Sequence, residues 1–263
     1  MISLIQIGSE TILLSVRVAA VLLATPILYA FTLPGSVRVL LVLSLAVTIS
    51  LGLSPSPSAA TTLDWGAFIA YAAQEITLGL ALAVGVLLAF GAVSFAGHLL
   101  DLQVGFSLSQ LYDPASGGRS TVVAAVFNQL AVLLFFILGA HHALLRGVAL
   151  SAKHFPPGSV WDLSSAPTLV LSQVGILFAI GFSLAAPVVV GLLMVELVMS
   201  VAARNLPQMN IFMMAIPVRI AVGLFLLALW SAGFFEGMTR AFESIYRFWD
   251  ALLAPNASGA AHG

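Results

Sequence analysis

Long apolar runs, separated by short clusters of helix-breaking residues, dominate this chain. A helix that crosses a bilayer needs about 20 mostly apolar residues. Runs of this kind cover residues 11–30, 37–53, 67–99, 121–145, 168–199 and 209–235. Proline, glycine and serine mark the breaks, as in FTLPGS at 31–36 and SPSPSAATT at 54–62. The pattern predicts an all-α, polytopic helical membrane protein with about six long apolar segments.

Composition supports a membrane protein and excludes several other classes. Hydrophobic residues make up 61% of the chain and charged residues 7%, whereas soluble domains carry about 25% charged residues. The net charge of −1 provides no basic surface for nucleic acid. Because the sequence has no cysteine, disulfides, thiolate metal sites and cysteine nucleophiles are excluded.

Four charged residues lie within or beside the apolar runs: Arg17, Glu75, Glu196 and Arg219. A charge exposed to lipid at the bilayer centre costs at least about 2.5–3.5 kcal/mol, so these groups should face protein, water or the interface. One interpretation places Arg17, Arg38 and Glu196 at helix ends, from which long side chains reach the interface. The other pairs them with neighbouring subunits of an assembly. The Lys and Arg residues of the predicted loops divide almost evenly and do not choose an orientation.

The segment DLQVGFSLSQLYDPASGGRST at 101–121 fits neither a spanning helix nor a solvent loop. Glycines and serines at 105, 107, 109 and 116–118 favour mobility. Phe106, Leu108 and Leu111 add apolar bulk, and the residue before Pro114 is pushed out of the helical region. The residues alone leave two interpretations open: a connecting loop whose apolar side chains rest on helix ends, or a functional apolar element.

Catalytic and metal-binding patterns are missing from the sequence. It contains no H-E-x-x-H, no G-x-S-x-G and no phosphate-binding glycine loop followed by Lys-Ser or Lys-Thr. His141 and His142 are adjacent and would point about 100° apart on a helix, which disfavours a shared metal. Pro156 and Pro157 break the helix after His154, which argues against a haem-ligand pair. We expect no enzyme activity and no cofactor.

Three stretches carry a resemblance to a known family. AGHLLDLQVGFSLSQLYDP (96–114), FFILGAHHALLRGVALSAKHFPPG (135–158) and ARNLPQMNIFMMAIPVRI (203–220) together resemble the FliR family of type III secretion export-gate proteins. The resemblance runs from Arg17 to about Gly223. The family usually has an acidic or amide residue and glycine before the histidine pair, whereas this chain has Gly139-Ala140. This departure puts a special role of His141 in doubt.

The resemblance implies an architecture and partners. FliR-like proteins assemble with FliP and FliQ subunits into a helical, pore-containing complex in the basal body, so the expected location is the bacterial inner membrane. Residues 1–254 would form one export-gate domain, FliP-like over about 1–165 and FliQ-like over 166–250. The second part rests on residues 183–224, which are similar to the FliQ helical hairpin. Residues 255–263 would be a disordered tail.

The resemblance also implies residue roles. A plug loop would close the pore to ions until an unfolded flagellar export substrate passes, since an apolar constriction excludes water and ions. Its residues would be Gly105, Phe106, Ser107, Leu108, Ser109, Gln110, Leu111, Asp113 and Pro114. Candidates for subunit contacts are Arg17, Arg38, Glu75, Glu196, Arg204, Pro207, Gln208, Asn210 and Arg219.

Within RNLPQMN at 204–210, the amides could instead satisfy the backbone of a hairpin turn. The alternative is contact with other gate subunits or the switch protein FlhB. The histidine pair and PQMN resemble the flagellar branch of the family more than the injectisome branch. A different function class also stays open, a stand-alone secondary transporter or channel with polar groups at the bilayer midplane.

Overall fold

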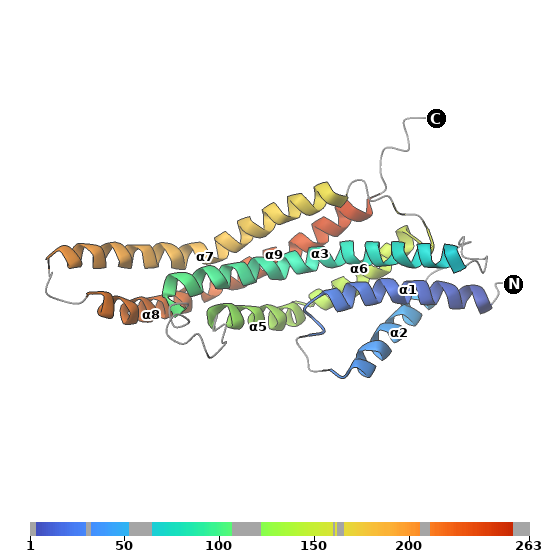
Figure 1. Ribbon diagram of the computed structural model, residues 1–263, viewed down its shortest axis with the longest axis horizontal. Coiled ribbons are helices and arrows are strands. Elements are labelled where there is room, and N and C mark those ends of the chain that lie inside the picture. The colour runs from blue at the N-terminus through green and yellow to red at the C-terminus, as the bar shows by residue number, and fades with distance from the viewer. Residues whose placement is uncertain are drawn as a thin grey trace, which may run out of the picture. The chain divides into compact units, whose positions relative to one another are not determined.

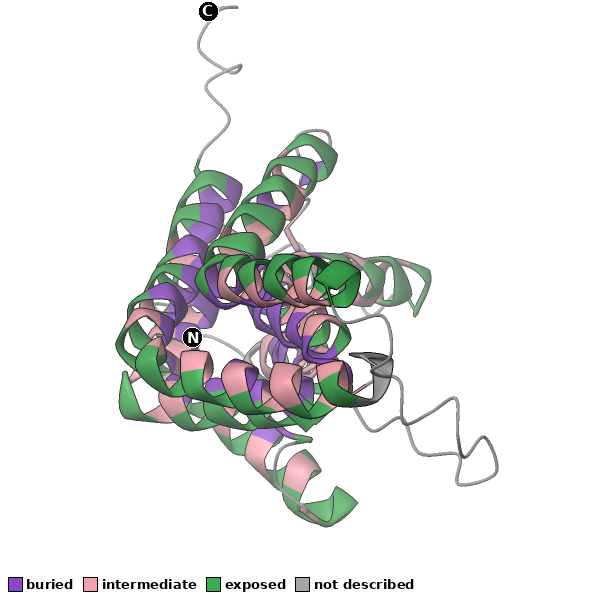
Figure 2. Cartoon of the chain, turned by 90° about the vertical axis from the view of Figure 1, so that its left-hand side faces the viewer, coloured by how far each residue is buried: buried purple, intermediate pink, exposed green. Residues whose placement is uncertain are grey.

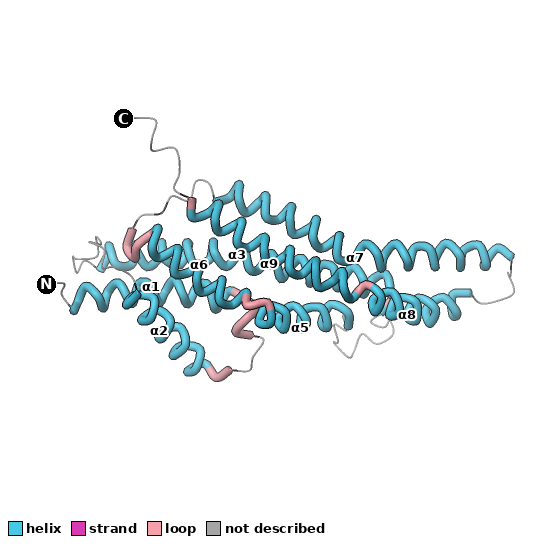
Figure 3. Tube along the Cα trace, turned by 180° about the vertical axis from the view of Figure 1, so that it is seen from behind, coloured by secondary structure: helices cyan, strands magenta, loops and turns pink. Residues whose placement is uncertain are grey.

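The computed structural model describes eight helices in the chain. The described residues are 4–29, 33–52, 65–106, 122–159, 161, 166–205 and 211–254, without the side chains of 4–7 and 211–213. The helices are α1 (Leu4–Ala24), α2 (Gly35–Gly52), α3 (Trp65–Val104), α5 (Val122–Ile137), α6 (Ala140–His154), α7 (Ala166–Asn205), α8 (Ile211–Leu229) and α9 (Ser231–Leu253) (Figure 1). The described residues form no strand (Figure 3). The predicted all-α class is confirmed.

Each predicted apolar segment falls on a helix, but two segments are divided. The run at 121–145 is interrupted at Leu138 and Gly139, where Gly139 has φ +70, a left-handed conformation that glycine adopts without steric strain. The run at 209–235 is interrupted at Trp230, after which α9 begins at Ser231. The apolar pattern did not predict α9 as a separate helix, because charged residues such as Glu236 and Arg240 interrupt its hydrophobic residues.

Several helices are long and apolar enough to cross a membrane. Among the described residues, α2, α3 and α7 meet this criterion singly. Two broken pairs, α5 with α6 and α8 with α9, meet it together, which raises the count to five. Buried and exposed residues lie on different sides of most helices (Figure 2). Many of the exposed residues are large and apolar, as expected where lipid or another apolar partner replaces water.

Internal contacts divide the chain into two units. Unit 1 contains Met1–Leu88, Gly139–Val174 and Glu243–Gly263, and unit 2 contains Ala89–Leu138 and Gly175–Phe242. In unit 1, α1 and α2 pack side by side (Figure 1). Trp249 of α9 lies against Gly147 of α6 and Gly85 of α3, and its indole N–H donates to the Leu82 carbonyl at 3.0 Å. This bond satisfies the one polar group of a buried aromatic side chain.

Unit 2 has an aromatic core. The rings of Phe90, Phe135 and Phe242 lie 5.5–5.8 Å apart between centroids, within the range that favours tilted and edge-to-face pairs. Pro187 lies inside α7 and removes one backbone donor from it. In the preceding turn, the Leu184 carbonyl accepts the indole N–H of Trp230 at 3.1 Å. The Trp230 side chain, at the break between α8 and α9, thus bonds the α7 backbone in the turn before the proline.

A glycine permits the close approach of α1 and α3 in unit 1. A Cβ atom at Gly79 would lie 2.7 Å from the Ala20 Cβ and 2.8 Å from the Arg17 carbonyl oxygen. One neighbour is a backbone atom of α1 and the other is the Cβ atom of an alanine in α1, so no side-chain rotation can move either of them away. The absence of a side chain at Gly79 therefore sets the spacing of the two helices.

We expect Gly79→Ala to destabilise the chain. Overpacking costs about 1–3 kcal/mol, which outweighs the gain of up to about 1 kcal/mol that alanine brings to a helix. The midpoint of thermal unfolding in detergent should fall. Gly175→Ala is the matched control, because nothing lies within 4 Å of a Cβ there, and its midpoint should stay or rise. Equal midpoints for both variants would contradict the close approach.

Candidate functional site

A buried ion pair joins α1 and α3 in unit 1. The Arg17 Nε donates to Glu75 Oε2 at 2.6 Å, and Arg17 Nη2 donates to Glu75 Oε1 at 3.0 Å. The two residues are 1% and 2% exposed. This bidentate geometry is the one in which a guanidinium and a carboxylate bind most strongly. The pairing stabilises both charges, which apolar side chains cannot solvate.

The remaining groups around this pair come from α6 and the turn that follows it. Arg17 Nη1 donates to Ser151 Oγ at 3.3 Å, and Nη2 donates to the Phe155 carbonyl at 2.9 Å. The Gly158 amide donates to Glu75 Oε1 at 3.2 Å. These five residues form what we call the polar cluster. It connects three helices and the Phe155–Gly158 turn through one guanidinium and one carboxylate.

The polar cluster shows which partners two of the charges in the apolar runs have within this chain. Arg17 and Glu75 were predicted to face protein, water or the interface, and here they bond each other. Removing one member of a buried pair leaves the other charge uncompensated, at a cost of about 3–5 kcal/mol. Sequence analysis did not identify Ser151, Phe155 or Gly158. Phe155 and Gly158 contribute only backbone groups, which no side-chain pattern marks. The sequence feature that could have indicated them is the proline-glycine turn after α6.

A second ion pair joins α7 and α8 in unit 2. Arg219 Nη2 donates to Glu196 Oε1 at 2.8 Å, and the side chains are 29% and 47% exposed. Large apolar residues such as Leu193 and Val198 are exposed near Glu196 in the α7 sequence. Pairing neutralises both charges where the surface around them is apolar.

The other predicted contact residues lie at helix ends or outside the described residues. Arg38 is in the first turns of α2, with its guanidinium carbon 5.0 Å from the centroid of the Tyr29 ring, a cation–π distance. Arg204 is exposed in the last turn of α7, where a positive charge suits the helix dipole. Pro207, Gln208 and Asn210 lie outside the described residues.

Only the beginning of the predicted plug segment is described. Gly105 directly follows α3 with φ 95, and its amide donates to the Asp101 carbonyl at 3.2 Å. A side chain would strain this conformation, so a glycine is required at the helix end. Phe106 is partly buried. The remaining predicted residues, Ser107, Leu108, Ser109, Gln110, Leu111, Asp113 and Pro114, lie outside the described residues.

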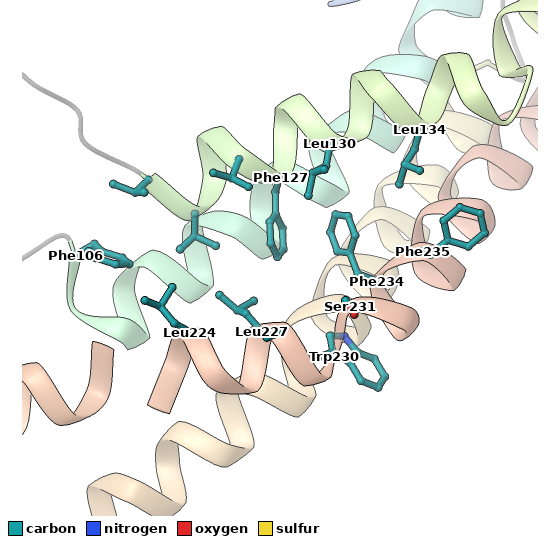
Figure 4. Close-up of a pocket in the computed structure, with 14 residues that line it drawn as sticks. Phe106, Phe127, Leu130, Leu134, Leu224, Leu227, Trp230, Ser231, Phe234 and Phe235 are labelled. Atoms are coloured by element: carbon teal, nitrogen blue, oxygen red, sulfur yellow. The ribbon is translucent and has the colours of Figure 1, made fainter. Parts of the chain in front are cut away.

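Phe106 borders an apolar groove of about 500 Å³ in unit 2 (Figure 4). The groove is lined by Phe106, Val122, Val123, Val126, Phe127, Leu130, Leu134, Leu224, Leu227, Ala228, Trp230, Ser231, Phe234 and Phe235. The rings of Phe127 and Phe234 meet at 4.5 Å between centroids. Such a surface offers apolar contact and almost no hydrogen bonding.

Asp101 makes a buried contact that the sequence analysis did not single out. Its Oδ1 accepts the Val123 amide and its Oδ2 accepts the Ala124 amide, both at 2.9 Å. These amides are in the first turn of α5, where no earlier carbonyl of the helix can accept them. Asp101 is 1% exposed. The sequence feature that could have indicated this contact is an acidic residue at the end of an apolar run, just before a segment with several glycines.

The histidines form no metal site in the part of the chain that the structure describes. The rings of His141 and His142 lie 4.0 Å apart between centroids. No group of three or more His, Asp or Glu side chains there converges as metal ligands.

Comparison with known proteins identifies the family. Residues 9–245 match the family described as bacterial export proteins, family 1. The chain belongs to this family. The predicted resemblance to FliR is confirmed, since the chain is 27% identical to the flagellar biosynthetic protein FliR of Aquifex aeolicus over 92% of this chain and 93% of that protein.

Two further relatives come from other bacteria. The flagellar biosynthetic protein FliR of Escherichia coli K12 is 34% identical over 60% of each chain. The surface presentation of antigens protein SpaR of Shigella sonnei is 27% identical over 68% of this chain and 70% of that protein. The polar cluster and the Asp101 contact both lie within the residues that match the export family.

We expect Arg17→Ala to destabilise this export protein by about 3–5 kcal/mol, because the buried carboxylate of Glu75 loses its counter-charge. Arg240→Ala is the matched control. Its i,i+4 pair with Glu236 is exposed, and such a pair contributes at most about 1 kcal/mol. Thermal unfolding of the detergent-solubilised chain measures both effects.

A double variant tests whether pairing is the cause. Arg17→Met combined with Glu75→Leu removes both charges, so it should recover part of the loss. Recovery should stay incomplete because the Phe155 carbonyl and the Gly158 amide lose partners. A double variant less stable than Arg17→Ala would argue against an electrostatic origin.

Proposed function

We propose that this chain is a pore-forming structural subunit of the flagellar type III protein export gate. The observation that carries the proposal is the match to the bacterial export family over residues 9–245. The alignment with the FliR protein of Aquifex aeolicus covers 92% of the chain. The identity with FliR of Escherichia coli is 34%, against 27% with SpaR, and this higher identity supports the flagellar assignment. The proposed location is the bacterial inner membrane, within the flagellar basal body.

The proposed partners are FliP- and FliQ-type subunits, an FlhB-type switch protein and unfolded flagellar export substrates. Exposed apolar residues on α7 and α8, including Leu197, Val201 and Phe225, support an apolar environment of lipid or protein around these helices. In the proposed assembly, residues 1–165 take a FliP-like place and residues 166–250 a FliQ-like place. Arg38, Arg204 and the Glu196–Arg219 pair are the charged groups left for subunit contacts.

The proposed plug is the segment from Gly105 to Pro114. Two described features support it: the left-handed Gly105 ends α3, and Phe106 directs apolar bulk toward the groove (Figure 4). An apolar element in a pore excludes ions by keeping the constriction dry. The role is mechanical, and it requires no catalytic group or cofactor.

We expect the chain to co-purify with FliP- and FliQ-type subunits of the same organism when all are co-expressed and extracted in detergent. It should be present as a single copy in one large complex, and it should restore motility to a strain that lacks its own FliR. The readouts are native mass spectrometry and swimming in soft agar. A chain that stays monomeric and transports a small solute would refute the proposal and support a stand-alone transporter.

We expect the double variant Phe106→Gly/Leu108→Gly, and a deletion of 106–111, to leave the complex assembled but permeable to ions. Loss of apolar bulk should let water and ions through the constriction. Leakage is measured as ion current in reconstituted membranes. A deletion of equal length in the tail, 258–263, is the matched control and should leave the conductance at the wild-type level. Unchanged conductance in the assembled plug variants would reduce the segment to a connecting loop.

A further inference from the structure

The bend between α8 and α9 in unit 2 has no proline to cause it. The two helices are bent by 64°, yet backbone hydrogen bonds continue through the break. The Trp230 amide donates to the Leu226 carbonyl at 2.9 Å, and the Phe234 amide donates to the Trp230 carbonyl at 3.0 Å. Glycine and serine close together let a helix bend, and Ser231 and Gly233 stand here. A contact from outside the helix is then needed to select one angle.

The Trp230 side chain provides such a contact. It lies at the bend (Figure 4), and its indole N–H donates to the Leu184 carbonyl of α7 at 3.1 Å. A Cβ atom at Gly233 would lie 2.5 Å from atoms of the Trp230 ring, so the ring covers the first turn of α9. A Cβ atom at Gly237 would lie 2.3 Å from Leu184 Cδ2. Two glycines one turn apart therefore admit the ring and the residue that it bonds.

The bonded carbonyl lies in a turn of α7 that a proline weakens. Pro187 follows Leu184 by three residues. It has no amide to offer the Ser183 carbonyl, and its ring crowds that carbonyl. In apolar surroundings, neighbouring helices must supply the donors that such a turn lacks, and Leu184 is only 2% exposed. The Trp230 bond thus joins the weakened turn of α7 to the bend between α8 and α9.

Beyond Pro187, α7 and α8 are tied to each other. Arg219 Nη2 donates to Glu196 Oε1 at 2.8 Å, and a Cβ atom at Gly191 would lie 2.4 Å from Leu226 Cδ1. The ion pair and the close approach connect the two helices at different levels. We call α8 together with residues 188–205 of α7 the two-helix arm.

We propose that Trp230 is a latch, a positioning residue whose indole bond to the Leu184 carbonyl holds the two-helix arm at a fixed angle to α9. Pro187 and the Ser231–Gly233 turn are the two points at which the helices bend. The latch sets the direction in which the arm presents its half-exposed ion pair. This inference concerns the chain alone, so it stands or fails independently of the proposed export function.

The test measures the bend directly in the full-length chain in detergent. Because the chain has no cysteine, nitroxide labels can be attached through cysteines introduced at the exposed positions 214 on α8 and 240 on α9. With a rise of about 1.5 Å per residue and a bend of 64°, these Cα atoms lie about 33 Å apart. A straight helix would place them about 39 Å apart. Pulsed electron paramagnetic resonance resolves the two distances.

Trp230→Phe keeps an aromatic ring and removes the donor. Loss of one hydrogen bond should raise the population of straighter forms by about two- to ten-fold, seen as added intensity on the long side of the distance distribution. Gly233→Ala is a second variant, since its methyl group displaces the ring from the first turn of α9. It should shift the distribution in the same direction.

Trp249→Phe is the matched control. It removes the other indole bond from α9 to a helix carbonyl, that of Leu82 at 3.0 Å, away from the bend. The midpoint of thermal unfolding should fall in both tryptophan variants, whereas the distance distribution should change only in Trp230→Phe. Equal distributions for Trp230→Phe and the wild type, or an equal shift in Trp249→Phe, overturn the latch. A lower midpoint in Trp230→Phe without a shift also overturns it.

A double-variant cycle tests whether Trp230 acts through the proline-weakened turn. Pro187→Ala returns an amide to α7 and should also lengthen the distance. Because both substitutions act on the same contact, the shift in Trp230→Phe/Pro187→Ala should be smaller than the sum of the single shifts. Fully additive shifts would show two independent bends, and the latch would be refuted.

The cycle uses the same two label positions in every variant, so each comparison differs only at residues 187 and 230.

Discussion

The bidentate pair between Arg17 and Glu75 is the constraint around which unit 1 is arranged. Two opposite charges can be buried among apolar helices only if nearly every donor and acceptor finds a partner. Ser151, Phe155 and Gly158 complete that set, so α1, α3, α6 and the following turn cannot shift independently. The net stabilisation from such a pair is small compared with apolar burial. Its main effect is to make other arrangements of the same helices costly.

Helix α3 carries a buried carboxylate near each end, and each one bonds groups from another helix. Glu75 accepts from Arg17 and from a turn amide, whereas Asp101 accepts from the first turn of α5. Where lipid or apolar side chains surround a helix, an unpaired amide or carboxylate has no water to bond. Each contact therefore determines which helix packs against that turn of α3.

Small residues set the spacing between the helices that these polar contacts join. Gly79 admits the backbone of α1, and Gly97 admits that of α5. At Gly147 the space is filled by the ring of Trp249, so the contact there is between a helix backbone and a large apolar side chain. Membrane helices commonly use small residues in this way, since burial from water contributes little to their association. Glycine placement and polar pairing act together, because a hydrogen bond of 2.9 Å across two helices requires their backbones to come close.

The class of this protein followed from local pattern: apolar runs of membrane-spanning length, breakers between them and motifs of the export family are all properties of neighbouring residues. The need of Arg17 and Glu75 for partners was also predictable, because charges in apolar runs are costly. Their pairing with each other was not, since 58 positions separate them in the chain. The contact of Asp101 was not predicted either, because its partners also lie far along the chain. Helix α9 was not predicted because its charged residues interrupt an apolar run, although its buried residues share one side. Sequence determines which groups require a partner, and only the packing of distant helices decides which group meets that requirement.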